Sequence, residues 1–319
     1  MYKDHKIGVV VPAYNEELLI LETLEGMPDF VDSIFVINDC STDNTLELIK
    51  QRQEKDDRVV LINHEKNRGL GQSLIDGYLA SADSDVEITA VMAGDNQMYP
   101  GDLPKLINKI VVQGYDYVKG NRLLHENIDF MPKYRFFGNA MLTILTKFAT
   151  GYYSLMDPQC GYTAIKNTAL RGIPIEEMTK GYGYNADILN MLNIRGYSVC
   201  DVEVRPVYGR EQSKIKLWKY IPKTSWLLVR LFVRRLWQRY VVRDFHPLVL
   251  FYLFALFNVL FLIIPLIVRF FHMYRIEGHA PRTTMIILVF LLITTFQSIL
   301  FAIWMDMDYN RKDRRGPFV

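Results

Sequence analysis

The stretch Glu87–Pro100, EITAVMAGDNQMYP, contains the junction on which the fold prediction rests. Its apolar run Ile88–Ala93 stops at Gly94 and Asp95, a pattern typical of a buried strand that ends in a polar loop. Asp95 and Gln97 supply a carboxylate and an amide, the hard oxygen ligands that Mg²⁺ or Mn²⁺ prefers. An ordinary strand-to-turn junction has the same residue types, so the neighbouring sequence must decide between the two interpretations.

Short β-branched or aromatic runs alternate with runs of helical apolar spacing from residue 1 to about residue 207. This alternation predicts an α/β domain with a mostly parallel central sheet covered on both faces. We expect strands at Ile7–Val11, Ile34–Asn38, Val59–Asn63, Ile88–Ala93 and Tyr115–Lys119, and helices at Glu16–Met27, Asn44–Lys55, Gly71–Ala82 and Pro104–Gln113. We also expect Thr42 or Asp43 to cap the second helix and Gly114 to end the fourth.

Carboxylates, amides, glycines and two arginines follow these five strands. In such a sheet ligands bind outside the carboxyl ends of the strands. The residues at that edge are Pro12–Glu16, Asn38–Asp43, Asn67–Gly69, Asp95–Gln97 and Gly120–Arg122. Loops are polar in any case, but this set suits a nucleoside diphosphate with a metal ion. The spacing disfavours a dinucleotide-binding site, because Leu74 stands where GxGxxG needs glycine, and the absence of a GxxxxGK[ST] motif disfavours a P-loop enzyme.

Composition narrows the class of protein and its compartment. The 319 residues suffice for one large domain or two smaller ones, and the net charge of +2 favours neither nucleic acid nor an acidic partner. Cys40, Cys160 and Cys200 form no CxxC pair, which excludes a disulfide scaffold or a thiolate zinc site and suits a reducing compartment. The N-terminal residues enter a strand pattern without a signal-peptide apolar region, so we expect a cytoplasmic catalytic domain.

Eight segments occur in a characteristic order. They are VVVPAYNEE (9–17), VINDCSTDNT (36–45), NRGLGQSLIDGY (67–78), MAGDNQMYP (92–100), VKGNR (118–122), RFFGNAML (135–142), MDPQCGYTAI (156–165) and YGREQSKIK (208–216). Together they resemble the family 2 glycosyltransferases of GT-A fold, in particular the branch of dolichyl-phosphate mannose synthase and bacterial polyprenyl-phosphate glycosyltransferases. The resemblance covers roughly residues 6–220 and implies a GT-A nucleotide-sugar-binding catalytic domain over residues 1–215.

The resemblance implies a role for each matching residue. The positions that hold the base and ribose of the donor nucleotide correspond to Pro12, Tyr14, Glu16 and Asp39. Asp95 matches the second carboxylate of the DxD motif, a metal and diphosphate ligand, and Gln97 matches a further metal ligand. Ala93 replaces the first aspartate, which predicts looser binding of Mg²⁺ or Mn²⁺, with the donor phosphates completing the shell. Arg210 and Lys214 lie on a loop that resembles one closing over the donor, although solvated surface cations are the alternative.

Asp157 lies in a DPxxGY turn that resembles the catalytic-base region of the family, and an ordinary turn aspartate beside Pro158 is the alternative. A sugar hydroxyl acceptor would need a general base. A lipid monophosphate is already anionic, since its second pKa is about 6, and Asp157 would then only orient it. Arg122 and Arg135 are catalytic candidates that bind phosphate oxygens, because guanidinium groups pair with them through two donors.

The composition changes after residue 215. Apolar residues recur at helical spacing among arginines and tryptophans, which predicts amphipathic interfacial helices over residues 216–246, with a basic helix packed on the soluble domain as the alternative. Leu248–Val268 and Met285–Met305 are each long enough to cross the roughly 30 Å hydrocarbon core of a membrane. We expect a two-helix transmembrane hairpin over residues 247–310 and a basic cytoplasmic tail over residues 311–319.

These features together predict an inverting glycosyltransferase, an integral membrane protein that acts at the cytoplasmic membrane face. It would move a sugar from a UDP- or GDP-sugar to a polyprenyl (undecaprenyl or dolichyl) phosphate, and relatives with two spans can form homo-oligomers. One alternative is a lipid-linked saccharide acceptor, although Trp237–Tyr240 does not match the QxxRW motif of processive synthases. The other is a non-enzymatic membrane scaffold with a degenerate transferase domain, which Ala93 alone suggests.

Overall fold

The computed structural model describes residues 1–123, 133–181, 183–205, 217–279 and 281–312, without the side chains of residues 133–140, 217–221, 277 and 312. Two compact units divide these residues, a first unit that ends at Val233 and a second unit, Arg234–Lys312. The strands are β1 (Ile7–Ala13), β2 (Ser33–Asn38), β3 (Val59–Asn63), β4 (Ile88–Val91), β5 (Tyr117–Asn121), β6 (Thr163–Lys166) and β7 (Val199–Glu203).

The α-helices are α1 (Ile20–Glu25), α2 (Thr45–Gln53), α3 (Leu70–Asp83), α4 (Leu103–Val111), α5 (Lys133–Thr150), α6 (Asn167–Arg171), α7 (Tyr184–Arg195), α8 (Leu217–Trp237), α9 (Leu248–Phe257), α10 (Ile264–Glu277) and α11 (Arg282–Lys312). Two 3₁₀ turns, η1 (Pro100–Asp102) and η3 (Ile175–Glu177), and two π-helical segments, η4 (Gln238–Arg243) and η5 (Asn258–Ile263), are interspersed among them.

The strands that the structure describes form one seven-stranded sheet in the order β3-β2-β1-β4-β6-β5-β7. Only β6 runs against its neighbours, β4 and β5, so the sheet is mostly parallel as expected. Thr163, the first residue of β6, pairs with Val91 near the end of β4 and with Lys119 near the end of β5. We call this the carboxyl edge of the sheet, and the antiparallel direction of β6 delivers the preceding segment, residues 156–162, to it.

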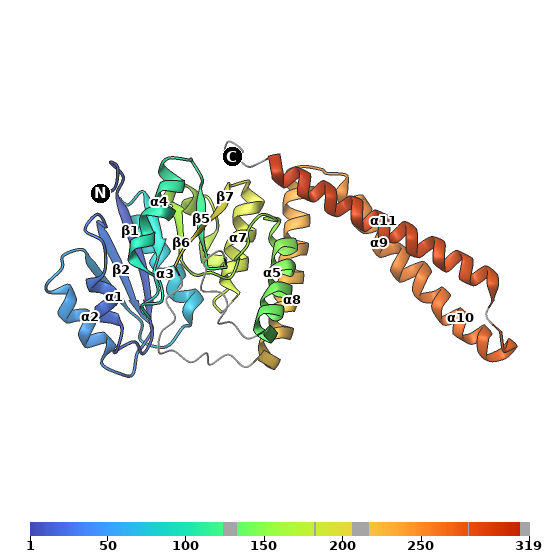
Figure 1. The fold of residues 1–319 in the computed structure, drawn as a ribbon, viewed down its shortest axis with the longest axis horizontal. Coiled ribbons are helices and arrows are strands. Elements are labelled where there is room, and N and C mark those ends of the chain that lie inside the picture. Colours follow the sequence, from blue (N-terminus) through green and yellow to red (C-terminus); the bar gives the residue numbers. More distant parts are fainter. Residues whose placement is uncertain (124–132, 182, 206–216, 280, 313–319) are drawn as a thin grey trace. The chain divides into compact units, whose positions relative to one another are not determined.

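Helices cover both faces of the sheet because alternate strand residues point to opposite sides (Figure 1). Val9 and Val11 belong to a core with residues of α1, α2 and α4. Val10 and Ile37 face the other way, into a core with α3, α6 and α7. Every residue of β1 is buried, which fits a central strand covered on both sides.

The five expected strands and four expected helices are all present, with ends shifted by a few residues. The first helix starts later than expected, at Ile20, because residues 14–19 form the loop after β1. Asn44 is the N-cap residue of α2, whereas Asp43 accepts a hydrogen bond from the Thr45 N–H (3.0 Å). Gly114, expected to end the fourth helix, lies beyond its C-cap residue Val112, where it has φ +79° and donates its N–H to the Ile110 carbonyl (3.1 Å).

In the first unit, α8 packs on α5 and α7 through a small apolar cluster that includes Leu228 and Leu231. The buried Asn190 of α7 reinforces this contact, because its amide donates to the carbonyls of both Ala149 in α5 and Leu231 in α8 (2.9 Å each). Trp226 and Val229 on α8 are 73% and 54% exposed, so an apolar stripe of this helix faces away from the domain.

The second unit is a helical hairpin in which α11 packs against α9, η5 and α10. Among the described residues, two stretches are long and apolar enough to cross a membrane, Leu248–Ile276 and Arg282–Arg311, and each contains one of the two expected spans. The first stretch includes η5 directly before Pro265, and this π-helical segment accommodates a residue that has no backbone N–H.

A buried ionic cluster joins the start of the second unit to α11. Arg235 and Asp306 are both fully buried and form a two-pronged pair, with both nitrogen–oxygen distances 2.7 Å. The Tyr240 hydroxyl donates to Asp306 (2.5 Å), and the Asn310 amide donates to the same carboxylate (2.8 Å). The Asp306 carboxylate thus accepts hydrogen bonds from three side chains, which offsets part of the cost of keeping its charge away from water.

Candidate active site

The loops after β1 and β2 are joined by hydrogen bonds at the carboxyl edge. The Asn15 side-chain oxygen accepts the Thr42 N–H (2.8 Å), and the Asn15 N–H donates to the Ser41 hydroxyl (3.0 Å). The Glu16 N–H donates to the Thr45 hydroxyl (2.8 Å). Two predicted donor contacts therefore lie on a rigid double loop, Tyr14 with its ring 47% exposed and Glu16 half-buried.

Asp39, a third predicted donor contact, is buried and organises the loop before α3. Its two carboxylate oxygens accept the N–H groups of Arg68 (2.7 Å) and Gly69 (2.8 Å). His64 Nδ1 lies 2.8 Å from Asp39, and its Nε2 lies 3.0 Å from Asp76 without hydrogen-bond geometry. The structure thus gives Asp39 a loop-organising role that the sequence reasoning missed, and a nucleotide contact by Asp39 stays a prediction.

Three residues at this edge have left-handed backbone conformations that non-glycine residues rarely adopt. They are Asn15 (φ 57°), Cys40 (φ 58°) and Asn96 (φ 54°), which follow β1, β2 and β4. Asparagine adopts this conformation more readily than most residues, whereas cysteine has no such preference. Strained backbone of this kind is common at ligand-binding sites, and here it recurs on three adjacent loops, although Lys3 (φ 47°) and Asp4 (φ 67°) before β1 also show it.

The loop after β4 presents Asp95. Its carboxylate accepts the Gln97 N–H (3.1 Å), and among the described residues no lysine, arginine or histidine pairs with it. Burial raises the pKa of the Asp95 carboxyl above its ordinary value, which means that its charge is poorly solvated. A cation would relieve that cost, so Asp95 fits a divalent metal. The described residues contain no group of three acidic, histidine or cysteine side chains that could hold a metal.

Pro12 and Gly94 bring this loop close to β1. The Gly94 N–H donates to the Pro12 carbonyl (3.1 Å), and a Cβ on Gly94 would lie 3.3 Å from that oxygen. Pro12, which was predicted to bind the donor nucleotide, is therefore buried, and its backbone carbonyl accepts the hydrogen bond from Gly94.

Arg122 and Asp157, two predicted catalytic residues, form an ion pair at the same edge. Arg122 Nε donates to Asp157 Oδ2 (2.8 Å) and Nη2 donates to Oδ1 (3.2 Å). The Asp157 side chain is 5% exposed and that of Arg122 is 44% exposed, so the carboxylate lies below and the guanidinium above. The two hydrogen bonds allow the buried Asp157 carboxylate to fix the orientation of the Arg122 guanidinium.

A buried lysine below this pair is a residue that sequence reasoning did not select. Lys119 of β5 is fully buried, and its ammonium donates to the Cys160 carbonyl (2.6 Å) and the Asn185 side-chain oxygen (2.8 Å). Burial lowers the pKa of Lys119 to about 8. The only sequence signal was its place in the segment VKGNR, since an alternating strand pattern does not distinguish a buried lysine from a solvated one.

Three further predicted residues cannot be described in the same detail. Arg135 lies in α5, but its side chain is outside the described part of the structure. Arg210 and Lys214 fall in residues 206–216, which are also outside it.

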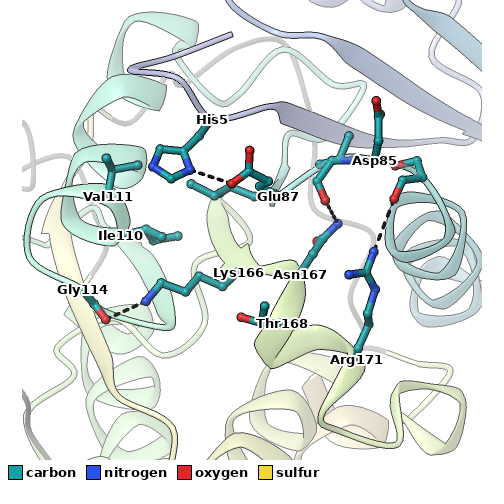
Figure 2. A pocket seen from close by; sticks show the side chains of 13 residues that line it. His5, Asp85, Glu87, Ile110, Val111, Gly114, Lys166, Asn167, Thr168 and Arg171 are labelled. Atoms are coloured by element: carbon teal, nitrogen blue, oxygen red, sulfur yellow. Dashed lines mark hydrogen bonds and ion pairs between the residues drawn. The ribbon is translucent and has the colours of Figure 1, made fainter.

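A pocket of about 470 Å³ lies at the opposite, amino edge of the sheet (Figure 2). His5 and Glu87 form an ion pair there (2.8 Å), and Lys166 donates to the Gly114 carbonyl (2.9 Å). Arg171 donates to the Ala82 carbonyl (2.9 Å). Its charged side chains are thus occupied with one another or with backbone, and we do not assign the reaction to this pocket.

Comparison with known proteins identifies the family of the chain. The sequence profile described as "Glycosyl transferase family 2" matches residues 8–173, more than half of the chain. The chain belongs to glycosyl transferase family 2. It is therefore a glycosyltransferase, and its sheet has the GT-A-like arrangement of family 2, as the sequence predicts.

Several curated relatives within family 2 have related names. The chain is 27% identical over 219 residues to a UDP-N-acetylglucosamine–dolichyl-phosphate N-acetylglucosaminyltransferase of Methanococcus voltae, covering 64% of this chain and 87% of that protein. It is 25% identical to an undecaprenyl-phosphate mannosyltransferase of Micrococcus luteus, covering 57% and 76%.

Solved structures show the same fold. Glucosyl-3-phosphoglycerate synthase of Mycobacterium tuberculosis, in complex with Mn²⁺, UDP-glucose and phosphoglyceric acid, superimposes with a TM-score of 0.55 at 18% identity. The superposition covers 73% of this chain and 80% of that one. At this identity the likeness concerns the fold alone.

Proposed function

We propose that the protein transfers a sugar from a nucleotide-sugar donor to a polyprenyl phosphate, with inversion, at the cytoplasmic face of a membrane. A UDP- or GDP-sugar is the donor, and undecaprenyl or dolichyl phosphate is the acceptor. The observation that carries this proposal is the presence, in one chain, of a family 2 domain and two helices of membrane-spanning length. The names of the Methanococcus and Micrococcus relatives, which include dolichyl and undecaprenyl phosphate, support the acceptor class.

The donor nucleotide binds at the carboxyl edge in this proposal. Tyr14 offers an exposed ring to the base, and Glu16 offers a carboxylate to the ribose. Asp39 holds the loop of Arg68 and Gly69 beside them. The strained backbone of these loops supports this assignment, because ligand binding can offset its cost.

Asp95, with Gln97, would hold Mg²⁺ or Mn²⁺ against the donor diphosphate. Asp95 is half-buried and has no cationic partner among the described residues, which supports this role, and the replacement of the first DxD aspartate by Ala93 implies that phosphate oxygens complete the shell. When bound, the ion would neutralise charge on the diphosphate as it leaves.

An acceptor phosphate oxygen forms a bond to the anomeric carbon while the bond from that carbon to the diphosphate breaks. Attack from the opposite face inverts the configuration, and the nucleoside diphosphate departs with the bonding electrons. A phosphate monoester with its second pKa at about 6 needs no general base at neutral pH. Arg122 then binds a phosphate oxygen and Asp157 orients Arg122, while Arg135, Arg210 and Lys214 remain further proposed phosphate contacts.

The exposed side of α8 supports an interfacial position for this helix. Trp226, Val229 and Val233 are more than half exposed, and Arg230 lies beside them on the surface. Aromatic and apolar residues combined with arginine suit the headgroup layer of an anionic membrane. A lipid-borne phosphate would reach the catalytic domain from that layer.

The test is a transfer assay with vesicles that contain polyprenyl phosphate, a panel of UDP- and GDP-sugars, and Mg²⁺, Mn²⁺ or chelator. We expect one donor to yield a single-sugar polyprenyl phosphate of inverted anomeric configuration, in a metal-dependent reaction. An extended glycan would instead indicate a lipid-linked saccharide acceptor. Absence of transfer with every donor would contradict the proposal.

A further inference from the structure

The buried ammonium of Lys119 lowers the stability of the first unit unless its interactions compensate for the loss of hydration. Its side chain is fully buried, and burying a charged amine carries a free-energy cost that hydrogen bonds only partly offset. The strand itself does not need this side chain, because β6 and β7 pair with the β5 backbone on both sides. A methionine could fill similar space without the charge, so the ammonium calls for another explanation.

Both hydrogen bonds of Lys119 lead toward the turn that carries Asp157. The ammonium binds the Cys160 carbonyl directly and the side-chain oxygen of Asn185. The Asn185 amide in turn donates to the Gln159 carbonyl (3.1 Å). Two consecutive carbonyls of the turn are therefore held from below, one by each residue.

The other end of the turn faces the proposed reaction. Asp157 lies three residues before Cys160, and the Cys160 N–H donates back to the Asp157 carbonyl (3.3 Å). The Asp157 side chain then holds Arg122 through two hydrogen bonds. A continuous chain of contacts thus runs from the buried ammonium to the half-exposed guanidinium.

We propose that Lys119 and Asn185 are positioning residues that fix the 157–160 turn, so that Asp157 holds Arg122 in the orientation that binds a phosphate oxygen during transfer. This inference rests on the proposed function. It assigns no substrate contact to either residue, and their effect reaches the reaction through Arg122.

The test compares matched variants of the full chain in vesicles with the best donor. We expect Lys119→Met and Asn185→Ala to lower kcat at least about tenfold, with the KM for the nucleotide sugar changed less than about twofold. The controls are Lys166→Met and Asn167→Ala, since Lys166 also donates to a backbone carbonyl and Asn167 is also a buried asparagine, both at the amino edge. These controls should keep kcat within about twofold, even where Asn167→Ala lowers the melting temperature.

A double variant separates positioning from general destabilisation. If both residues act through Arg122, Lys119→Met in an Arg122→Ala background should cost less than about twofold more, because residues in one network are not additive. Additive losses, or a wild-type kcat in Lys119→Met, would overturn the inference. If Lys119→Met does not fold, Asn185→Ala alone decides in the same way. Inactive wild-type protein would overturn the proposed function and this inference together, whereas active wild type with unaffected variants overturns only the inference.

Discussion

The two edges of the β-sheet differ in how their charged side chains are paired. At the amino edge, Glu87 pairs with His5, and the ammonium of Lys166 and the guanidinium of Arg171 donate to backbone carbonyls (Figure 2). Asp85 pairs there with Lys6. At the carboxyl edge, Asp95 has no cationic partner among the described residues. Positive φ does not separate the edges, since Asn15, Cys40 and Asn96 have it at the carboxyl edge and Lys3 and Asp4 have it before β1.

This contrast teaches that a hollow by itself does not mark a reaction site. The pocket at the amino edge is spacious, yet its charged side chains have partners in the protein and need no ligand to offset a desolvation cost. The carboxyl edge carries Asp95, a half-buried carboxylate without a cationic partner among the described residues, and such a cost persists where a ligand can compensate for it.

The sharpest test of the contrast is Asp95→Ala. Removing the proposed metal ligand should abolish metal-dependent donor binding and lower kcat by about 10²–10³-fold, the loss typical when one stabilising group at a charged leaving group is removed. Calorimetric titration of nucleotide sugar with and without Mn²⁺ measures the first effect. Asp85→Ala, the matched carboxylate at the amino edge, should change neither. Unchanged donor affinity in Asp95→Ala would remove the metal role.

A second test is Asp157→Asn. We expect turnover to fall about 10–100-fold, because the amide can offer only one acceptor oxygen to the two donors of Arg122. Steady-state kinetics of Asp157→Asn, Arg122→Ala and the double variant should give a coupling energy of about 1–3 kcal/mol. Independent, additive losses would show that the ion pair does not act as a unit.

A third test uses the pH dependence of stability. Burial lowers the pKa of Lys119 to about 8, with Asp157, Arg122 and Cys160 as the charged or titratable groups that influence it. Above that pH the unfolded chain, with a lysine pKa of about 10.4, binds more protons than the folded one, so this residue makes the free energy of unfolding rise with pH. Between pH 7.5 and 9.5 the rise should be about 2 kcal/mol.

Denaturant unfolding of wild type and Lys119→Met at the two pH values measures this contribution as a difference. Lys166→Met should retain the full rise. A wild-type difference that persists in Lys119→Met would mean that another group is responsible.

The smallest effect is expected at the amino edge. The His5–Glu87 pair is exposed on both sides, so Glu87→Gln should change the free energy of unfolding by less than about 1 kcal/mol and transfer by less than about twofold. Thermal melting and the vesicle assay measure both. A large loss of transfer would erase the functional distinction between the edges.

The local pattern of apolar residues in the sequence was enough to predict much of the fold. The strands that end at Asn38 and Asn63 have strong β-branched runs, and their ends were predicted to the residue. β6 and β7 were not located, because four- and five-residue strands give little periodic signal. The antiparallel direction of β6 depends on pairing with β4 and β5, which no local pattern encodes.

The resemblance proposed candidate site residues one by one, without the contacts between them. The resemblance selected Arg122 and Asp157 separately, and their pairing across 35 residues required the fold. The loop-organising hydrogen bonds of Asp39 and the burial of Lys119 are likewise tertiary properties, since either residue type is usually solvated. The strain at Cys40 had no sequence signal at all.

The ion pair of Arg235 with Asp306 has a consequence for how the chain is made. The two residues are 71 positions apart, so Arg235 is synthesised well before Asp306, its counter-ion. Leaving one member of such a pair alone in its final environment costs about 3–5 kcal/mol. The end of α8 can therefore reach its mature packing only after the second apolar helix has been synthesised, which makes assembly of this hairpin a late event in biogenesis.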